Sequence, residues 1–265
     1  MTSLLRGAAL ITGAGSGIGQ ATALAFARYG ARQLALCDIR SDGIAQTTQK
    51  LKNHHKDLEI LSLNVDTSRE ADVDRAVEHT AKQFGRLDIA VNNAGINGKA
   101  ASSDQLEFED WRKTMSVNLD GVWLCQRAEI RQMLKQEALD QAPRSGRGII
   151  VNVASMLGLV AASPSTPAVA YTASKHGVMG LTRTDAVMYA PRGIRINAVC
   201  PGYVATPLLE AVGANDILAA QVEKVPQKRY CSVEEVADAI SFLASPMSSF
   251  VTGHGLVLDG GYSCQ

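Results

Sequence analysis

Tyr171 and Lys175 are the two side chains of this sequence that are best placed for proton chemistry. They lie four residues apart in the segment YTASK, and that spacing puts both side chains on one face of a helix. A phenol ionises near a pH of about 10, and a neighbouring ammonium favours the phenolate. The pair is therefore a candidate general acid or base. The same spacing also arises by chance on surface helices, so the interpretation depends on the motifs that precede it.

A glycine-rich turn near the N-terminus is the second candidate site. Residues 8–12 form a short apolar run typical of a buried strand, and a helical pattern continues from the glycines to about Tyr29. The motif G-x-G-x-x-G fails because position 18 is Ile18, whereas T-G-x-x-x-G-x-G fits with Gly13, Gly17 and Gly19. Small residues at a helix start let a pyrophosphate approach its positive end. A flexible turn is the alternative, but strand, glycines and helix in this order favour phosphate binding.

Asp38 follows the next apolar run, residues 33–37, about twenty residues beyond the glycine turn. A carboxylate at this place can accept hydrogen bonds from the ribose hydroxyls of adenosine, and it repels a 2′-phosphate. Arg40 lies two residues on and offsets part of that repulsion. Asp38 therefore predicts NAD as the cofactor, with NADP less favoured. The alternative is that Asp38 merely caps the following helix.

The rest of the chain alternates between strand-like and helix-like segments. This alternation predicts the α/β class: a Rossmann-type, doubly wound, seven-stranded parallel sheet flanked by helices in a three-layer αβα arrangement, as one domain over residues 1–265. Further strands are expected at 58–64, 87–91, 149–154, 194–200 and from 255. Helices are expected from Arg69, as one broken or two consecutive helices over 104–137 with Asn118 in the second, and at 232–244, with a weakly helical flap over 207–226.

Several polar or small residues follow directly after these predicted strands. In a doubly wound sheet, ligands collect beyond the C-terminal ends of the strands. The residues that fall there are Gly13, Asp38, Asp66, Asn92 and Ser155. Their coincidence at one edge of the sheet predicts a ligand site.

Composition excludes several other classes of protein. Hydrophobic residues make up 46% and charged residues 20% of the 265 residues, and Lys plus Arg equals Asp plus Glu at 26 each. This balance gives no electrostatic footprint for nucleic acid or for an acidic membrane. The N-terminus does not have the pattern of a signal peptide, and the five scattered cysteines are typical of reduced thiols. We expect a cytoplasmic protein without a metal site.

The motifs together resemble the short-chain dehydrogenase/reductase family, in its single-domain branch. The resemblance covers essentially the whole chain, and it becomes specific through the order and spacing of its parts. These parts are T-G-x-x-x-G-x-G, N-N-A-G at 92–95, Ser155, Y-x-x-x-K at 171–175, Pro201-Gly202 and Asp259-Gly260-Gly261.

The resemblance implies a role for each matching residue. Tyr171 would be the acid/base, Lys175 would lower its pKa and bind the nicotinamide ribose, Ser155 would hold the substrate oxygen, and Asn118 would anchor a water that links Lys175 to solvent. The implied cofactor-binding residues are Gly13, Ser16, Gly17, Ile18 and Gly19 at the pyrophosphate, Asp38 at the ribose, Val65 and Asp66 at the adenine, Asn92, Ala94 and Gly95 at the middle of the cofactor, and Pro201, Gly202, Val204 and Thr206 toward the nicotinamide.

The implied function is an NAD-dependent oxidoreductase that interconverts a secondary alcohol and a ketone. A predominantly apolar pocket favours a hydrophobic substrate, with a cyclic specialised metabolite as a candidate; its expected residues are Met156, Leu157, Val160, Val169, Leu208 and Leu209. A redox-neutral isomerase or lyase, and a non-catalytic dinucleotide sensor, are the alternatives. The resemblance also implies a homodimer or homotetramer formed through helices around 113–137 and 171–190.

Two segments depart from the family pattern. The spacer between Ser155 and Tyr171 is longer than usual, and the additional length falls in Ser163–Pro167, beside the expected substrate site. The loop 141–148 is also long, and we expect it on the side away from the chemistry. The first departure leaves the predicted chemistry intact but makes the substrate harder to infer.

Overall fold

The computed structural model describes residues 3–140, 144–210 and 215–265. A seven-stranded sheet with only parallel pairings lies at the centre, in the order β3-β2-β1-β4-β5-β6-β7. This confirms the predicted fold class. The strands are β1 (Ala8–Thr12), β2 (Gln33–Asp38), β3 (Glu59–Asn64), β4 (Ile89–Asn92), β5 (Gly148–Val153), β6 (Ile194–Pro201) and β7 (Gly255–Leu258).

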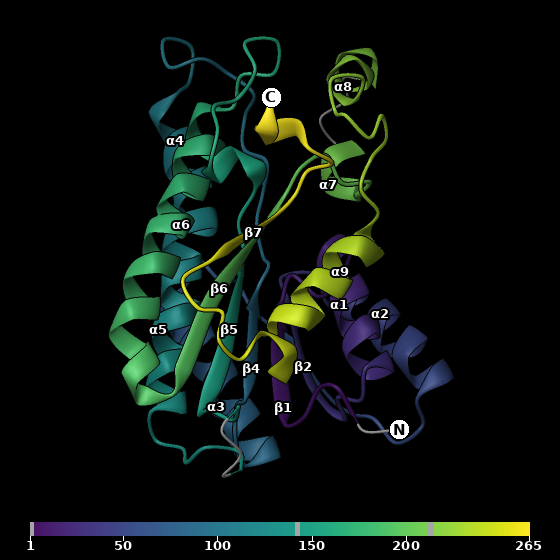
Figure 1. Ribbon diagram of the computed structural model, residues 1–265, viewed down its shortest axis with the longest axis vertical. Coiled ribbons are helices and arrows are strands. Elements are labelled where there is room, and N and C mark those ends of the chain that lie inside the picture. Colours follow the sequence, from purple (N-terminus) through teal and green to yellow (C-terminus); the bar gives the residue numbers. More distant parts are fainter. Residues whose placement is uncertain (1–2, 141–143, 211–214) are drawn as a thin grey trace.

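Helices cover both faces of the sheet, which gives three layers (Figure 1). The central strands are buried on both faces, so their side chains form continuous apolar runs rather than an alternating pattern. One face carries α1 (Gly17–Arg28), α2 (Ser41–His54) and α9 (Val233–Leu243), and the other carries α3 (Glu70–Phe84), α4 (Phe108–Met115), α5 (Gly121–Met133) and α6 (Val169–Tyr189).

Residues 108–133 differ from the prediction in one respect that bears on the site. The helical stretch is continuous, and α4 and α5 are joined by a π-helical turn, η1 (Ser116–Asp120). Asn118 therefore lies in this wide turn and not in the second helix, which corrects the sequence-based placement. A π-turn widens the hydrogen-bond ladder by one residue and is frequent at functional sites.

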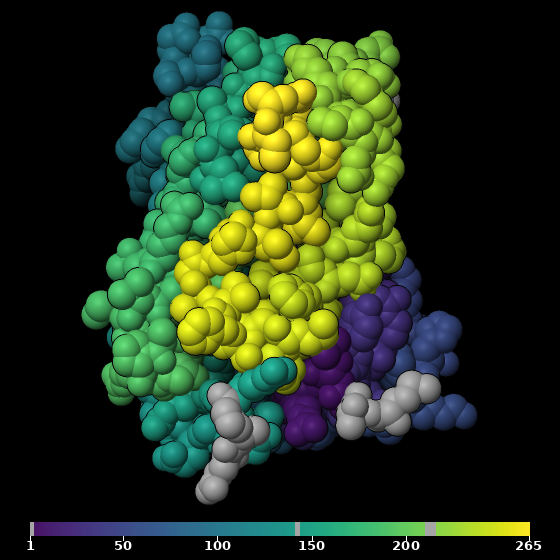
Figure 2. Space-filling view, viewed as in Figure 1, coloured from purple at the N-terminus to yellow at the C-terminus, as the bar shows by residue number. Residues whose placement is uncertain are grey.

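The predicted flap contains two short helices, α7 (Pro207–Glu210) and α8 (Asn215–Val222). Residues 211–214 of this flap, and 141–143 of the long loop, lie outside the described residues. The C-terminal residues, yellow in Figure 2, run along the surface and reach the flap, where Gln265 Nε2 donates to the Lys224 carbonyl at 2.8 Å. The flap is thus tied to the end of the chain.

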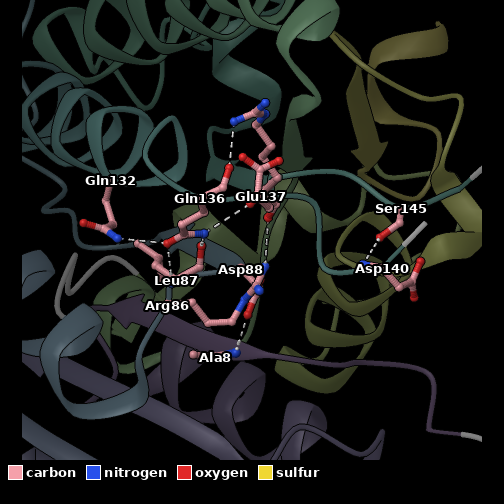
Figure 3. Close-up of polar contacts among 10 residues, drawn as sticks. Ala8, Arg86, Leu87, Asp88, Gln132, Gln136, Glu137, Asp140 and Ser145 are labelled. Carbon is pink, nitrogen blue, oxygen red and sulfur yellow. Dashed lines mark hydrogen bonds and ion pairs between the residues drawn. The ribbon is translucent and has the colours of Figure 1, made fainter. Parts of the chain in front are cut away.

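A polar cluster around Gln136 lies at the end of the sheet opposite the strand C-termini (Figure 3). The Gln136 side-chain oxygen accepts from the Leu87 amide at 2.8 Å, and its nitrogen donates to the Leu87 and Arg147 carbonyls. Asp88 accepts from the Ala8 amide and from Arg86 Nε at 2.9 and 2.7 Å. Burial raises the pKa of Asp88, and these two donors oppose that rise. The cluster joins β1, β4, β5 and the segment after α5.

Residues 3–140, 144–210 and 215–265 lack both a membrane-spanning helix and a cluster of metal ligands. Within them, no helix has the length and apolar character needed to cross a membrane. Nor do these residues include a group of three or more His, Cys, Asp and Glu side chains arranged to hold a metal ion.

Candidate active site

Tyr171 and Lys175 lie one turn apart near the start of α6, as their spacing predicts. The Lys175 ammonium is 5.5 Å from the centre of the Tyr171 ring. It also donates to the Val153 carbonyl at 2.8 Å, at the C-terminal end of β5. Lys175 is 4% exposed, so its charge is held inside the protein beside the phenol. The helix and the strand end together fix the relative positions of the two groups.

Ser155 approaches the same place from β5, two residues after the strand ends. Its hydroxyl accepts from the Leu157 amide at 3.1 Å and so caps the short helix η2 (Met156–Gly158). Burial raises the pKa of Tyr171, and a hydrogen bond with the Ser155 side chain partly opposes this rise. The three side chains implied by the family resemblance therefore meet at one point, although they come from two different elements.

The pKa shifts differ from the sequence-based expectation. The sequence predicts that Lys175 lowers the pKa of Tyr171, whereas in the structure burial is the largest influence and raises it. Burial also lowers the pKa of Lys175 to about 8. Both shifts have the same cause, because burial disfavours the charged form of each group. An additional positive charge in this space would add to the effect of Lys175 in favouring the phenolate.

Asn118 holds the segment after β4 in place. It is fully buried, and its side chain accepts from the Ile96 amide at 2.9 Å and donates to the Ile96 carbonyl at 2.8 Å. A Cβ atom at Gly95 would lie 3.3 Å from Asn118 Oδ1 and 3.8 Å from Lys175 Nζ. Gly95 therefore lies between Asn118 and Lys175 and allows their close approach.

The glycine turn, residues 13–19, lies beside these residues and packs against Asn93. Asn93 Nδ2 donates to the carbonyls of Thr12 and Gly13 at 3.0 and 3.1 Å, and a Cβ at Gly13 or Gly19 would collide with this amide at 2.6 Å. These two glycines are therefore required for packing. Gly17 is different, because its φ is +52° and the nearest atom to a Cβ there is 3.6 Å away, on Thr206.

Two observations indicate that the start of α1 could bind a pyrophosphate. Ser16 is the N-cap residue but forms no capping hydrogen bond through its side chain, and the first turn of this fully described helix carries no acidic residue. The positive end of the helix is thus left uncompensated at Gly17, Ile18 and Gly19, where an anion is favoured.

Asp38 lies at the end of β2, next to the glycine turn. Its Oδ2 accepts from the Gly15 amide at 2.8 Å and its Oδ1 from the Arg40 amide at 2.9 Å. Arg40 is the N-cap residue of α2, so Asp38 accepts a hydrogen bond from the backbone where that helix begins. Through its other oxygen Asp38 also connects the start of α2 to the glycine turn at Gly15. Each carboxylate oxygen keeps a further lone pair with which to accept a hydroxyl.

The two residues predicted at the adenine follow β3. Val65 is buried, and its amide donates to the Asp38 carbonyl at 2.9 Å. The Asp66 carboxylate accepts from the amide and the hydroxyl of Ser68 at 3.0 and 2.6 Å. Asp66 therefore orders the turn before α3, and Val65 sets the distance between this turn and Asp38.

Asn92 points away from the crevice. It is 1% exposed, and its Nδ2 donates to Glu129 and Asn152 inside the protein. Its neighbour Asn93, which the sequence motifs did not single out as a site residue, has its side chain on the crevice side. Strand residues alternate between the two faces, and this alternation is the signal that could have distinguished them. The amides of Asn93 and Ala94 both donate to Thr12 Oγ1.

These elements enclose a cleft of about 120 Å³ at the C-terminal edge of the sheet. Of the expected substrate-pocket residues, Leu208 and Leu209 line it, whereas Met156 is buried beneath Gly202. A larger cavity of about 900 Å³ lies at the opposite edge, near Arg6 and Arg195, and contains none of the predicted site residues. The residues of the smaller cleft are Ile18, Asn93, Gly95, Asn97, Val153, Ala154, Ser155, Tyr171, Lys175, Pro201, Gly202, Val204, Thr206, Leu208 and Leu209.

Comparison with known proteins agrees with this arrangement. A family model described as Enoyl-(Acyl carrier protein) reductase matches residues 13–263. The chain is 40% identical over 256 residues to cis-4-hydroxycyclohexanecarboxylate dehydrogenase of Sinomonas cyclohexanicum, with 96% of each chain covered. It is 38% identical over 275 residues to short-chain dehydrogenase anuF of Penicillium roqueforti (strain FM164), with 100% of this chain and 99% of the relative covered.

Solved structures show the same similarity in three dimensions. The crystal structure of levodione reductase matches with a TM-score of 0.90 at 36% sequence identity, covering 97% of this chain and 98% of the other. The fold, the cleft and these relatives define an oxidoreductase that belongs to a family whose members bind a nicotinamide dinucleotide. The chain belongs to the short-chain dehydrogenase/reductase family.

Proposed function

We propose that this protein is an NAD-dependent dehydrogenase that interconverts a secondary alcohol and a ketone on a hydrophobic, cyclic substrate. The observation that carries the proposal is the convergence of Ser155, Tyr171 and Lys175 at one cleft beside the glycine turn. The bound dinucleotide would accept the hydride from the alcohol or return it to the ketone. Side chains of this protein would transfer the proton and hold the substrate oxygen in place.

Tyr171 would transfer the proton to or from the substrate oxygen. Ser155 is positioned by its Leu157 contact to hydrogen-bond the same oxygen and to keep it beside the phenol. Lys175, held by the Val153 carbonyl, would stabilise the phenolate that forms when the proton leaves. Asn118 would act indirectly, by fixing the Ile96 backbone next to Gly95 and Lys175.

Asp38 supports NAD over NADP. A 2′-phosphate on the adenosine ribose would approach a carboxylate that already accepts two backbone amides. The negative charges of the phosphate and the carboxylate would repel each other and oppose NADP binding. The two hydroxyls of an unphosphorylated ribose can instead donate to the free lone pairs of the Asp38 oxygens. Pro201, Gly202, Val204 and Thr206 line the same cleft as Ser155 and would contact the nicotinamide end.

The substrate class is supported by the relatives and by the insert between Ser155 and Tyr171. Three relatives are named for cyclic compounds, namely a hydroxycyclohexanecarboxylate, cyclohexanol and levodione. In this chain the Ser163–Pro167 insert is held to the flap, because Gln221 Nε2 donates to Ser165 Oγ at 2.7 Å. An insert held in this way beside the proposed substrate site favours a compact, rigid substrate, such as a cyclic specialised metabolite, over a long flexible one.

A homo-oligomer in the cytoplasm completes the proposal. Large apolar side chains are exposed on the two helices that the family resemblance implicates, namely Trp123 on α5 and Val187 and Met188 on α6. Cys37, Cys125 and Cys200 are free thiols in the core, which suits a reducing compartment. Light scattering on the purified protein would give the number of subunits.

The first experiment is to measure the binding of NAD(H) and NADP(H) by calorimetry, followed by an absorbance screen for NADH with cyclic secondary alcohols and ketones. We expect tight NAD(H) binding and turnover of at least one cyclic substrate. Turnover of a substrate with no net change in NADH would favour the redox-neutral isomerase or lyase. Binding without any turnover across the panel would favour the sensor, and absence of binding would refute the proposal.

A further inference from the structure

Glu129 is a buried carboxyl group that the proposed chemistry does not use. It projects from α5 into the core with 0% exposure, beside the end of β4. Burial raises its pKa from 4.5 to about 8, and a hydrogen bond from Asn92 opposes this rise. No cation offsets its burial among the influences on this group. A charged carboxylate in such a place is costly, so the group requires a neutral form or a matched set of donors.

Asn92 is its direct partner. Asn92 Nδ2 donates to Glu129 Oε2 at 3.0 Å and to Asn152 Oδ1 at 3.0 Å. The remaining oxygen of each residue, Glu129 Oε1 and Asn92 Oδ1, is buried and has no hydrogen-bond partner among the described residues. Both orphaned atoms are acceptors when Glu129 is ionised, and they belong to two side chains that are already joined.

We propose that Glu129 is kept as a neutral carboxylic acid, paired through both oxygens with the carboxamide of Asn92, and that this acid–amide pair positions the end of β4 in the cofactor crevice. One proton on Glu129 Oε1 supplies the donor that Asn92 Oδ1 lacks. A single protonation thus satisfies both orphaned oxygens, which no ionised form of Glu129 does.

The pair acts on the crevice through the next residues of the chain. Asn93 follows Asn92, and its side chain holds the Thr12 and Gly13 carbonyls, while Ala94 and Asn93 both donate from the backbone to Thr12 Oγ1. A rotated Asn92 would shift these contacts, and with them the glycine turn. Glu129 is therefore a positioning residue and not a catalytic one.

A chain of hydrogen bonds extends from the pair toward α6. Asn152 Nδ2 donates to Gln126 Oε1 at 2.8 Å and to Thr182 Oγ1 at 2.9 Å. Gln126 Nε2 in turn donates to Asp185 at 2.7 Å. The orientation of Asn92 is thus fixed from two sides, by Glu129 and by a buried relay that ends at the α6 carboxylate.

The titratable groups around Glu129 are few. Cys125 lies one turn earlier on α5 and Cys37 comes from β2, and each thiol has a raised pKa caused first by burial and next by Glu129. Asn92 and Asn152 are the polar neighbours from β4 and β5, and Asp185 on α6 lies at the far end of the relay. The buried face of α3 carries only the uncharged side chains Val73, Ala76, Val77, Thr80 and Phe84.

The first test is infrared spectroscopy of the wild type and the Glu129→Gln variant at pH 6. We expect a carboxylic-acid C=O band in the wild type that the variant lacks, and we expect this band to disappear as the pH rises through the raised pKa. This measurement needs neither cofactor nor substrate. A difference spectrum at pH 6 that shows only carboxylate bands would overturn the proposal.

The second test compares Glu129→Gln with Glu129→Leu, and it rests on the proposed function because its measurement is NAD(H) affinity by calorimetry. A glutamine amide can donate to Asn92 Oδ1 and accept from Asn92 Nδ2, whereas leucine can do neither. We expect Glu129→Gln to bind like the wild type and Glu129→Leu to bind about ten-fold more weakly. If both variants bind equally well, or both lose affinity equally, the pair does not position the crevice.

A stability measurement covers the case in which Glu129→Leu does not fold. Because the pKa of Glu129 is raised in the folded state, the folded protein binds more protons than the unfolded chain between pH 4.5 and about 8. The resistance of the wild type to urea, relative to Glu129→Gln, should therefore fall as the pH rises through that window. Lys175, whose pKa burial lowers to about 8, is present in both proteins, so its contribution cancels in this comparison. A parallel pH dependence of the two proteins would refute a neutral Glu129.

Discussion

The two ends of the central sheet differ in how completely their buried polar groups are hydrogen-bonded. At the end that contains Gln136 (Figure 3), this buried amide uses its oxygen and its nitrogen in hydrogen bonds with Leu87 and Arg147. At the C-terminal edge, Lys175 makes one hydrogen bond to a carbonyl among the described residues and has a lowered pKa, and the pKa of Tyr171 is raised. Satisfied groups stabilise one end, while groups with remaining bonding capacity lie at the other.

The difference shows where stability and reactivity reside in this chain. A hydrogen-bonded amide that is completely satisfied has no capacity left for a ligand, so the Gln136 side chain holds the strands together and does not take part in binding. The ammonium at the other end has three N–H donors and a burial cost that a ligand or a phenolate can offset. Substitutions at the two ends should therefore separate activity from stability.

Tyr171→Phe should give the largest effect. Removal of the hydroxyl eliminates the proposed acid/base, and a positioned acid or base contributes about 100- to 10,000-fold in rate. We expect kcat to fall by at least about 100-fold while NAD binding and the melting temperature stay near those of the wild type. Steady-state kinetics, calorimetry and thermal melting would measure the three quantities. Retained turnover would refute the assignment of Tyr171.

Gln136→Leu should give the reverse pattern. It leaves the Leu87 amide and the Leu87 and Arg147 carbonyls without their partner, so the free energy of unfolding should fall by about 1–3 kcal/mol. We expect kcat of the folded enzyme to remain unchanged at low temperature. Gln132→Leu is the matched control, because Gln132 makes a single side-chain contact with Gln136 at 3.0 Å. Equal losses of stability in the two variants would contradict the role given to Gln136.

Asp38→Ala should give the smallest effect on activity, seen in the choice of cofactor, and it also leaves the Gly15 and Arg40 amides without this acceptor. Loss of the carboxylate removes both the ribose acceptor and the repulsion of a 2′-phosphate. We expect the ratio of kcat/KM for NAD to that for NADP to fall by about ten-fold, which corresponds to about 1.4 kcal/mol. Asp42→Ala removes an exposed carboxylate from the first turn of α2 and serves as the control. An unchanged ratio in Asp38→Ala would mean that the ribose contact is misassigned.

The fold could be predicted from the sequence because its signals are local. The apolar run before Gly13, the glycines themselves and the recurrence of strand and helix patterns each concern a few adjacent residues, and the structure places strands at all seven expected segments. The grouping of Ser155, Tyr171 and Lys175 followed from one topological rule, that parallel strands share a C-terminal edge.

What could not be predicted depends on contacts between distant segments. The π-turn at Asn118 places the Asn118 side chain against the Ile96 backbone, and no local pattern in 104–137 indicates the widened turn. The direction of the pKa shift at Tyr171 depends on how completely the surrounding chain excludes water. The inward orientation of Asn92 follows from strand alternation once the start of β4 is known, and the sequence alone did not fix that start.

The contact between Gly17 and Thr206 has a consequence for how the protein is made. The glycine turn leaves the ribosome early, but the residue that faces it is synthesised about 190 residues later, which takes about 10 to 40 s at 5–20 residues per second. During that interval the N-terminal strands and the α1 start exist without the wall formed by residues after β6. The emerging chain therefore cannot enclose a dinucleotide until its last quarter has been translated.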